Sequence, residues 1–254
     1  MFEQYYPAIN KLLFFRKRKH CPVCERDFFQ FLPLPKNYED SWEKYGFPYR
    51  GRDFETLNVK EFSCPFCYAS DRERLYAIYL EKHIFTDDRI RNILDIAPSD
   101  ALSTFIRNKF SFTYHTADLF MEKVDFKVDI EDTGFPDNQY DLLICSHVLE
   151  HVPDDKKAIN ELFRILRPGG KLIAMVPIVT SLKGILENQN GKNVESRWKY
   201  YGQDDHVRLY SKQGFVQRLQ EAGFKVTEYK PVDLITDYNK NGIDPDSVLY
   251  IASK

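Results

Sequence analysis

Hydrophobic and polar positions follow two different patterns along this chain, and the change falls near residue 90. Beyond it, short apolar runs alternate with segments whose apolar residues recur every three or four positions, the spacing of a helix. The predicted strands are 92–96, 112–116, 142–145, 171–176, 225–229 and 247–251, and the predicted helices are 101–109, 155–166 and 212–222. Alternation of this kind predicts an α/β fold with a doubly wound, mainly parallel sheet, whose last two strands form an antiparallel edge hairpin.

Before residue 90 the pattern is irregular, with many aromatic and turn-forming residues. A short helix is predicted over 2–19, and we expect the basic run at its end, 16–19, to be a solvated face. Ser70 and Glu73 form a capping box that starts a second helix, on which we expect the two arginines at 72 and 74 to be exposed. The chain is therefore divided into an N-terminal module, 1–85, and a second domain, 86–254.

Two Cys-Pro-x-Cys pairs, Cys21 with Cys24 and Cys64 with Cys67, lie in the N-terminal module and are separated by 39 residues. Four thiolates are the ligand set of a closed, tetrahedral zinc site, so the pairs predict a small four-cysteine zinc module that organises the fold. The alternative is four reduced cysteines in a hydrophobic core. The long segment between the pairs must carry secondary structure of its own.

Composition and charge indicate which kinds of substrate and partner the chain favours. The chain has 254 residues, is 43% hydrophobic and carries a net charge of −2. This balance favours a small-molecule or glycan substrate and gives no support to nucleic acid, although it does not exclude it. We find no apolar run long enough to span a membrane and no export signal, and together with the paired cysteines this predicts a cytoplasmic protein. The oligomeric state is not indicated.

The segment 140–154 combines a buried strand with three polar side chains, His147, Glu150 and His151. On a helical turn these would share one face at the carboxyl end of the strand, where open α/β sheets keep their chemistry. Three interpretations remain open. The side chains are capping and surface groups, or a histidine is a general base, or Glu150 and His151 bind a divalent metal together with the distant His206.

Small and acidic residues follow the earlier predicted strands. Asp95 is followed by the turn Ala97-Pro98-Ser99, and Asp118 ends the next strand, about where a ribose-binding carboxylate lies in such sheets. With 128–130, 135–153 and 166–177, these segments resemble the class I S-adenosylmethionine-dependent methyltransferases over residues 90–230, in particular bacterial members with an N-terminal zinc-ribbon-like segment.

The resemblance implies a seven-stranded, Rossmann-like sheet and a role for each matching position. Asp95, Ala97, Pro98 and Ser99 would hold the methionine end of S-adenosylmethionine. Asp118 would bind the ribose, Leu119, Asp129 and Ile130 would flank the adenine, and Cys145 and Ser146 would pass beneath the sulfonium. Ala97, Ser99 and Ala101 replace the glycines usual in the first turn, so we expect this turn to follow a different path.

The histidine cluster resembles metal-assisted O-methyltransferases, namely the small-RNA 3′-end 2′-O-methyltransferases and those of ubiquinone biosynthesis. Their Glu-x-x-Glu-His pattern matches Glu150 and His151, with His206 as the later histidine, while His147 replaces the first glutamate. The resemblance implies methyl transfer from S-adenosylmethionine to an oxygen nucleophile. The long segment 178–201 follows a strand at the carboxyl edge of the sheet, and we expect it to act as a lid over the substrate. The rival functions are RNA methylation and a non-catalytic methyltransferase-like binding protein.

Overall fold

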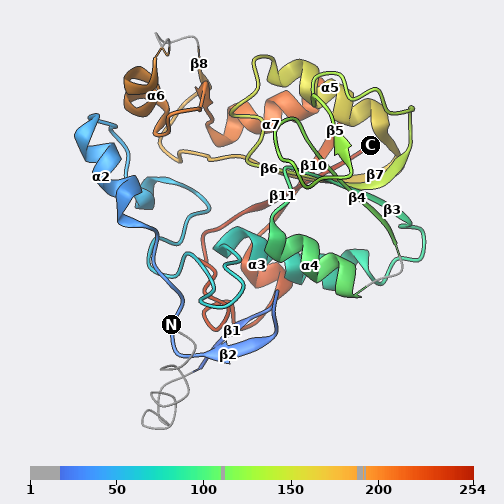
Figure 1. Cartoon of the computed structure of the whole chain (residues 1–254), viewed down its shortest axis with the longest axis horizontal. Coiled ribbons are helices and arrows are strands. Elements are labelled where there is room, and N and C mark those ends of the chain that lie inside the picture. Colours follow the sequence, from blue (N-terminus) through green and yellow to red (C-terminus); the bar gives the residue numbers. More distant parts are fainter. Residues whose placement is uncertain (1–17, 110–111, 188–190, 192) are drawn as a thin grey trace.

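The computed structural model describes residues 18–109, 112–187, 191 and 193–254 (Figure 1). The helix predicted over 2–19 and its basic run lie outside these ranges except for their last two residues, and Lys19 belongs to a strand. Within the described ranges, no helix has both the length and the apolar character needed to cross a membrane.

A seven-stranded sheet forms the centre of the molecule, in the order β10-β11-β7-β6-β3-β4-β5. Its strands are β3 (Asn92–Ile96), β4 (Thr113–Asp118), β5 (Phe126–Lys127), β6 (Tyr140–Ser146), β7 (Leu166–Met175), β10 (Lys225–Tyr229) and β11 (Leu249–Ser253). The pairs from β7 to β5 are parallel, and β11 is antiparallel to both of its neighbours. The predicted α/β class, the mainly parallel sheet and the antiparallel final strands are confirmed.

Helices cover both faces of this sheet (Figure 1). One face carries α3 (Asp71–Tyr79) and α4 (Asp100–Lys109), and the other carries α5 (Asp155–Ile165) and α7 (Lys212–Glu221). Because both faces are covered, β6 is buried along nearly its whole length, as expected of a central parallel strand. The arrangement is doubly wound, as predicted.

Three details of the sheet differ from the predictions. Strand β11 begins at Leu249 because the backbone of Val248 bonds instead to Thr56, whose hydroxyl oxygen accepts from its N–H at 3.1 Å and donates to its carbonyl at 3.2 Å. Strand β7 begins at Leu166, so the Pro-Gly-Gly turn lies inside the strand, where Gly169 takes a φ of +81°. Strand β5 has only two residues, too few to leave a periodic pattern.

The N-terminal module contains a hairpin and a long aromatic segment. Its elements are β1 (Lys19–Cys21), β2 (Arg26–Phe28), α2 (Lys36–Lys44) and the 3-10 turn η1 (Gly51–Asp53). Opposite this segment lie the antiparallel pair of strands β8 (Leu186–Glu187) and β9 (Arg208–Leu209) and the helix α6 (Val194–Tyr201) between them in the chain. Figure 1 shows α2 beside α6. The two parts share a second hydrophobic core around Trp42. Two short pieces remain in the described part of the chain, the π-turn η2 (Leu80–Ile84), which follows α3, and the helix α8 (Pro231–Leu234).

Arg74, which we expected to be exposed, is fully buried. Its guanidinium donates five hydrogen bonds to backbone carbonyls, which belong to Glu61, Phe62, Ala69, Asn241 and Gly242. The expectation was wrong because helical spacing cannot show that the module and the loop before β11 close over this side of α3. The main hydrophobic core also runs without a break from Cys21 and Cys64 into the sheet. The boundary at residue 85 stays a prediction.

Candidate functional site

The loop after β3 begins the site at the carboxyl edge of the sheet. Asp95 is 2% exposed and accepts a hydrogen bond from the hydroxyl of Tyr114 at 2.7 Å. Ala97 has a φ of +53°, and its N–H donates to the carbonyl of Ala117 at 2.9 Å. The reason for expecting a different path does not hold at this residue, because this alanine adopts the left-handed conformation that glycine adopts more easily. The different path itself stays a prediction.

Glu73, which was predicted only as part of a helix cap, also belongs to this site. Its carboxylate accepts from the N–H of Ser70 at 2.7 Å and from the Ser70 hydroxyl at 2.6 Å, so the predicted capping box is confirmed. The other oxygen of Glu73 accepts from the hydroxyl of Ser99, which itself accepts from the N–H of Leu102 at 3.1 Å. The start of α3 is thus tied to the turn 97–99 at the start of α4.

The next two predicted cofactor segments lie together beyond β4 and are joined by the N–H of Val128, which donates to the carbonyl of Asp118 at 3.2 Å. One oxygen of the Asp118 carboxylate accepts from two N–H groups of its own turn. Leu119 is 47% exposed, whereas Ile130 is 5% exposed, so of the two only Leu119 presents a large apolar surface to solvent. Asp129 accepts from the N–H of residue 131 at 2.9 Å and caps its own turn.

The central strand β6 brings the two halves of the site together. Cys145 is fully buried, and burial raises the pKa of its thiol. Ser146 hydrogen-bonds the hydroxyl of Tyr76 on α3, with 2.9 Å between the oxygens. His147 then takes a φ of +57°, and its N–H donates to the carbonyl of Met175 at 2.8 Å. The strand therefore ends in a sharp left-handed turn beside the start of the neighbouring loop.

Residues 147–151 form a turn and not the predicted helical turn. A hydrogen bond from the N–H of His151 to the carbonyl of Val148 closes it at 2.9 Å. The helical prediction was wrong because the left-handed residue at 147 cannot continue into a helix. The three side chains still converge, since a tight turn also brings residues three and four apart together.

Glu150, His151 and His206 each offer one ligand atom, and these atoms lie within 4.8 Å of one another. We call these three residues the trio. The rings of His151 and His206 meet edge to face, with centroids 4.7 Å apart. Glu150 is fully buried, and neither of its carboxylate oxygens has a hydrogen-bond partner among the described residues, although Nδ1 of His147 lies 3.1 Å from Oε1. A fully buried carboxylate that faces only imidazoles is costly, and a bound cation would reduce that cost.

The electrostatics agree with a cation site. Burial, and after it the guanidinium of Arg72, lowers the pKa of His147 to about 4. Burial by itself would raise the pKa of Glu150, but His147, His206 and His151 outweigh it and the pKa falls to about 2. Burial also lowers the pKa of His206, so burial favours the neutral imidazole at His147 and His206, the form in which histidine binds a metal ion.

Arg208 on β9 fixes the loop that carries two members of the trio, and nothing in the sequence indicated this. It is 4% exposed and donates to the carbonyls of Leu149 at 2.5 Å, Val152 at 2.6 Å and Pro153 at 2.9 Å. Arg208 lies two residues after His206, so the segment that carries the third member of the trio also holds the loop that carries the other two. Arginine is suited to this task because its planar fork presents several donors.

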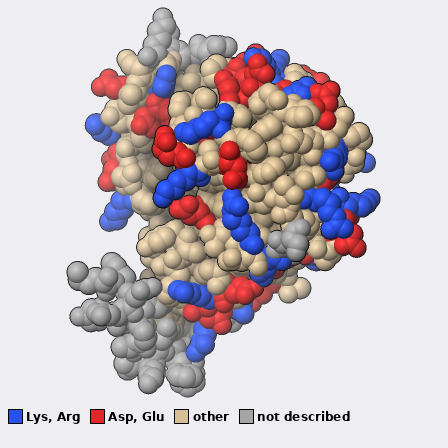
Figure 2. Space-filling model, turned by 45° about the vertical axis from the view of Figure 1, so that its right-hand side comes forward, with Lys and Arg blue, Asp and Glu red and all other residues tan. Residues whose placement is uncertain are grey.

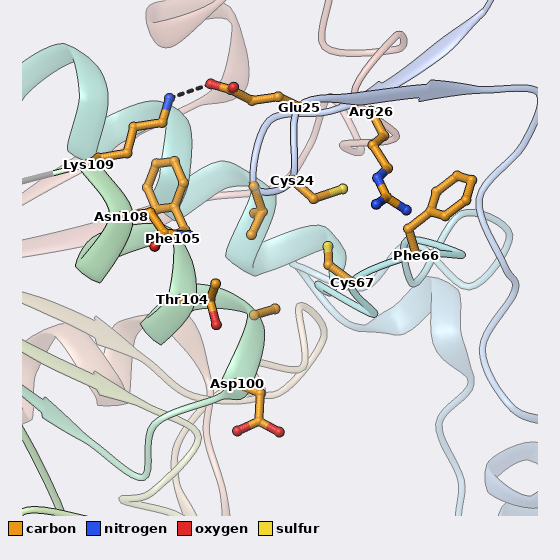
Figure 3. A pocket seen from close by; sticks show the side chains of 12 residues that line it. Cys24, Glu25, Arg26, Phe66, Cys67, Asp100, Thr104, Phe105, Asn108 and Lys109 are labelled. Atoms are coloured by element: carbon orange, nitrogen blue, oxygen red, sulfur yellow. Dashed lines mark hydrogen bonds and ion pairs between the residues drawn. The ribbon is translucent and has the colours of Figure 1, made fainter.

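The four predicted zinc ligands meet in the N-terminal module. The sulfur of Cys21 lies 3.7 Å from that of Cys67, and Cys24 and Cys64 are separated by the same distance. A tetrahedron of thiolates about 2.3 Å from zinc has sulfurs about 3.8 Å apart, so the cluster fits this ion. A cavity of about 450 Å³ lies between this cluster and α4, and Figure 3 shows Cys24 and Cys67 among the side chains that line it.

A second cavity, of about 380 Å³, lies in front of the trio. His147 and the trio form one side of it, and the segment between the cysteine pairs forms another. Arg72 on α3, residues 177–178, residues 201–203 and Asp205 also line it, so part of the predicted lid borders the space next to the trio. This cavity, and not the one beside the cysteines, adjoins the polar residues at the end of the central strand.

Comparison with known proteins places the chain among enzymes of one kind. Residues 68–229 match the family described as "Methyltransferase domain". The curated protein "Ubiquinone/menaquinone biosynthesis C-methyltransferase UbiE" of Vibrio cholerae is 27% identical over 115 residues, which are 41% of this chain and 44% of that protein. The protein of the same name from Francisella tularensis subsp. novicida is 30% identical over 116 residues, covering 41% and 46%. The match spans less than half the length of these relatives.

Similar solved structures have low sequence identity. A SAM dependent methyltransferase from Archaeoglobus fulgidus aligns with a TM-score of 0.46 and 15% identity over 72% of this chain and 94% of that one. The structure titled "PigF with SAH" aligns with a TM-score of 0.47 and 18% identity over 73% and 62% of the two chains.

Proposed function

We propose that this chain, which belongs to the methyltransferase-domain family and is an S-adenosylmethionine-dependent methyltransferase, transfers the methyl group to an oxygen nucleophile with the help of a divalent metal ion. The acceptor is a small molecule or glycan hydroxyl. One observation carries the proposal: the carboxylate of Glu150 is fully buried at the edge of a cavity, and the described groups that face it are imidazoles, with Nδ1 of His147 at 3.1 Å and Nε2 of His151 at 4.0 Å.

S-adenosylmethionine supplies a methyl group already activated by its sulfonium, so the protein mainly has to align donor and acceptor. Asp95 and the turn 97–99 would hold its methionine end, Asp118 its ribose, and Leu119 with residues 129–130 its adenine. The carboxyl edge of the sheet supports this assignment, because the parallel strands β3, β4 and β6 bring all these residues to one side. Ser146, fixed by Tyr76, would border the reacting carbon.

A divalent ion at the trio would lower the pKa of an acceptor hydroxyl and orient it. Glu150 would supply the anionic ligand, and His151 and His206 the two imidazoles, leaving further positions open for the acceptor. Asp205, whose carboxylate lies 3.3 Å from Nδ1 of His151, would orient that ring. His147, outside the trio, lines the cavity beside Glu150 and would remove water from the acceptor's surroundings or accept its proton.

The cluster of Cys21, Cys24, Cys64 and Cys67 would hold a structural zinc ion. All four coordination positions would be filled by thiolates, so the ion would stabilise the module without taking part in the reaction. The cluster is continuous with the core of the sheet, and loss of the ion would therefore affect both parts of the molecule.

Metal content and methyl transfer test the function together. Purified protein loaded with Mn²⁺ is expected to contain one zinc and one manganese per chain by plasma mass spectrometry. Glu150→Gln and His206→Ala should keep the zinc, lose the manganese and lose at least about 100-fold in kcat/KM, a typical cost of removing a metal ligand. Asp204→Asn, on an exposed neighbour of the trio, is the matched control and should change neither quantity.

Two results would contradict the proposal. One is full activity after chelation in protein that contains only the zinc of the cysteine cluster. The other is a product whose new methyl group is bonded to carbon, as the name of the Vibrio cholerae relative describes for that enzyme. A nuclear magnetic resonance spectrum of the product separates the two bonding types directly.

The rival functions have their own measurements. RNA methylation would need a basic surface along the strand, but on the face shown in Figure 2 lysines and arginines are interleaved with acidic residues. An RNA methyltransferase would bind RNA with an affinity that falls steeply with salt, and we expect no such binding. A non-catalytic binding protein would give no heat on titration with S-adenosylmethionine, whereas the proposed enzyme is expected to bind it.

A further inference from the structure

The segment between the two cysteine pairs crosses from the zinc cluster to the catalytic edge of the sheet. The N–H of Glu55 donates to the carbonyl of Ile178 at 2.9 Å, and the N–H of Thr180 donates to the carbonyl of Asp53 at the same distance. Further along the catalytic edge, the indole N–H of Trp42 donates to the carbonyl of Gly202 at 2.8 Å. These contacts fix the segment against the chain on both sides of the lid region.

The side that this segment presents to the cavity is aromatic. Tyr38, Trp42, Phe54 and Phe62 all line the space in front of the trio. The rings of Trp42 and Phe54 are stacked, with centroids 5.8 Å apart and 25° between their planes. We call these four residues the aromatic wall. It contains rigid, flat surfaces that are held by the second hydrophobic core.

Two polar groups on or beside this wall are already engaged. The Trp42 N–H is bonded to Gly202, and the hydroxyl of Thr56, which also lines the cavity, both donates to and accepts from the backbone of Val248. The other polar lining side chains, Arg72, Gln203 and Asp205, come from other segments, so the wall itself offers a sugar only the hydroxyl of Tyr38. Sugar hydroxyls that face its rings would lack partners, at a cost for each. A flat apolar ring would instead gain contact area and ring stacking.

We infer that the acceptor is a hydroxylated aromatic ring, and that the aromatic wall of the N-terminal module selects it. This inference rests on the proposed function and deepens it, because it names the class of substrate for the same site. The ring lies against the wall and directs its hydroxyl toward the trio. A cavity of about 380 Å³ accommodates one or two rings. The zinc module therefore contributes to substrate specificity as well as to stability.

Binding and turnover of two probes test the inference in Mn²⁺-loaded, full-length protein. The aromatic probe is 3,4-dihydroxybenzoate and the sugar probe is methyl α-glucoside. Isothermal titration in the presence of S-adenosylhomocysteine should show binding of the aromatic probe at least tenfold tighter than that of the sugar. With S-adenosylmethionine, the aromatic probe should acquire a methyl group on oxygen.

Variants of the wall locate the selectivity. Phe54→Ala should raise the KM for the aromatic probe at least tenfold, with a smaller change in kcat, and Phe54→Leu should recover part of the loss. Tyr49→Ala is the matched control, because Tyr49 belongs to the same aromatic segment and packs on Phe47 but does not line the cavity. It should leave both constants unchanged. Zinc content and near-ultraviolet circular dichroism confirm that each variant is folded.

The outcomes separate this inference from the proposed function. Methylation of the sugar in preference to the aromatic probe, or a KM that does not respond to Phe54→Ala in folded protein, overturns the inference and leaves metal-assisted transfer to oxygen standing. Wall-dependent binding of the aromatic probe with a carbon-methylated product, or with activity that survives chelation, overturns the proposed function and supports the role of the wall.

Discussion

The N–H of Val207 donates to the carbonyl oxygen of Glu150 at 2.9 Å. This hydrogen bond joins the turn after β6 to the residue that precedes β9, and so it joins the two segments that carry the trio. Arg208 adds three bonds from the same strand to the carbonyls on either side of Glu150 and His151. The distance between His206 and the other two ligands is therefore fixed by backbone contacts before any ion binds, which reduces the cost of binding.

Removal of the Arg208 guanidinium should weaken the metal site without removing a ligand. In Arg208→Met the turn loses its three bonds, and we expect Mn²⁺ affinity to fall about 10- to 100-fold, as for other groups that orient ligands. Isothermal titration of zinc-loaded protein measures this. Arg218→Met is the control, since Arg218 bonds Asp155 and Glu187 but no carbonyl of the turn. Equal losses of affinity in the two variants would show that the effect is general destabilisation.

The left-handed conformation of Ala97 predicts an asymmetric response to substitution. Ala97→Gly should raise the free energy of unfolding by up to about 1 kcal/mol, because glycine adopts a φ of +53° without steric cost. Ala97→Val should lower it by about 1–3 kcal/mol, since a branched side chain is strained there. Urea unfolding provides both values. If the two variants proved equally stable, the backbone at this turn would not be left-handed.

Asp95 should make the cofactor-free protein less stable as the pH rises. Burial is the main cause that raises the pKa of this carboxyl from 3.8 to about 7, so the folded protein holds a proton that the unfolded chain has already released. Stability is then full below about pH 4 and falls as the pH approaches 7. The loss is at most about 4 kcal/mol, at about 1.36 kcal/mol for each unit of pKa.

The variant Asp95→Asn isolates this effect. It keeps a side-chain oxygen for the Tyr114 hydroxyl but cannot ionise. We expect it to be more stable than the wild type at pH 8 and to approach wild-type stability at pH 4. Denaturant unfolding across this range decides the matter, and a difference between the two proteins that is constant with pH would refute the prediction.

Arg74 should be essential for joining the module to the sheet. In Arg74→Met five backbone carbonyls lose their donor in a buried region, and we expect unfolding to become easier by about 3–5 kcal/mol. Zinc should also pass to a colorimetric chelator faster. Arg72→Met, a change of the neighbouring arginine on the same helix, should cost less than about 1 kcal/mol. Comparable losses in the two variants would argue against the buried role of Arg74.

The sequence by itself determined the features that depend on local patterns. Apolar runs located the central strands, because a strand buried on both faces is apolar along its length. Ser70 and Glu73 identified a helix start, and two short cysteine motifs identified the cluster, since each of these signals lies within four residues of chain. The order of acidic and small residues after the strands was enough to suggest the family.

The tertiary structure alone decided which distant residues meet. No local pattern shows that Arg74 would be enclosed by a loop near residue 241, or that Arg208 would hold the turn after β6. The left-handed residues Ala97 and His147 depend on hydrogen bonds to neighbouring strands, which propensity cannot report. The same holds for the aromatic wall, because its rings come from a segment that looked like a connection between two pairs of cysteines. Close packing of segments far apart in the chain places it in front of the trio.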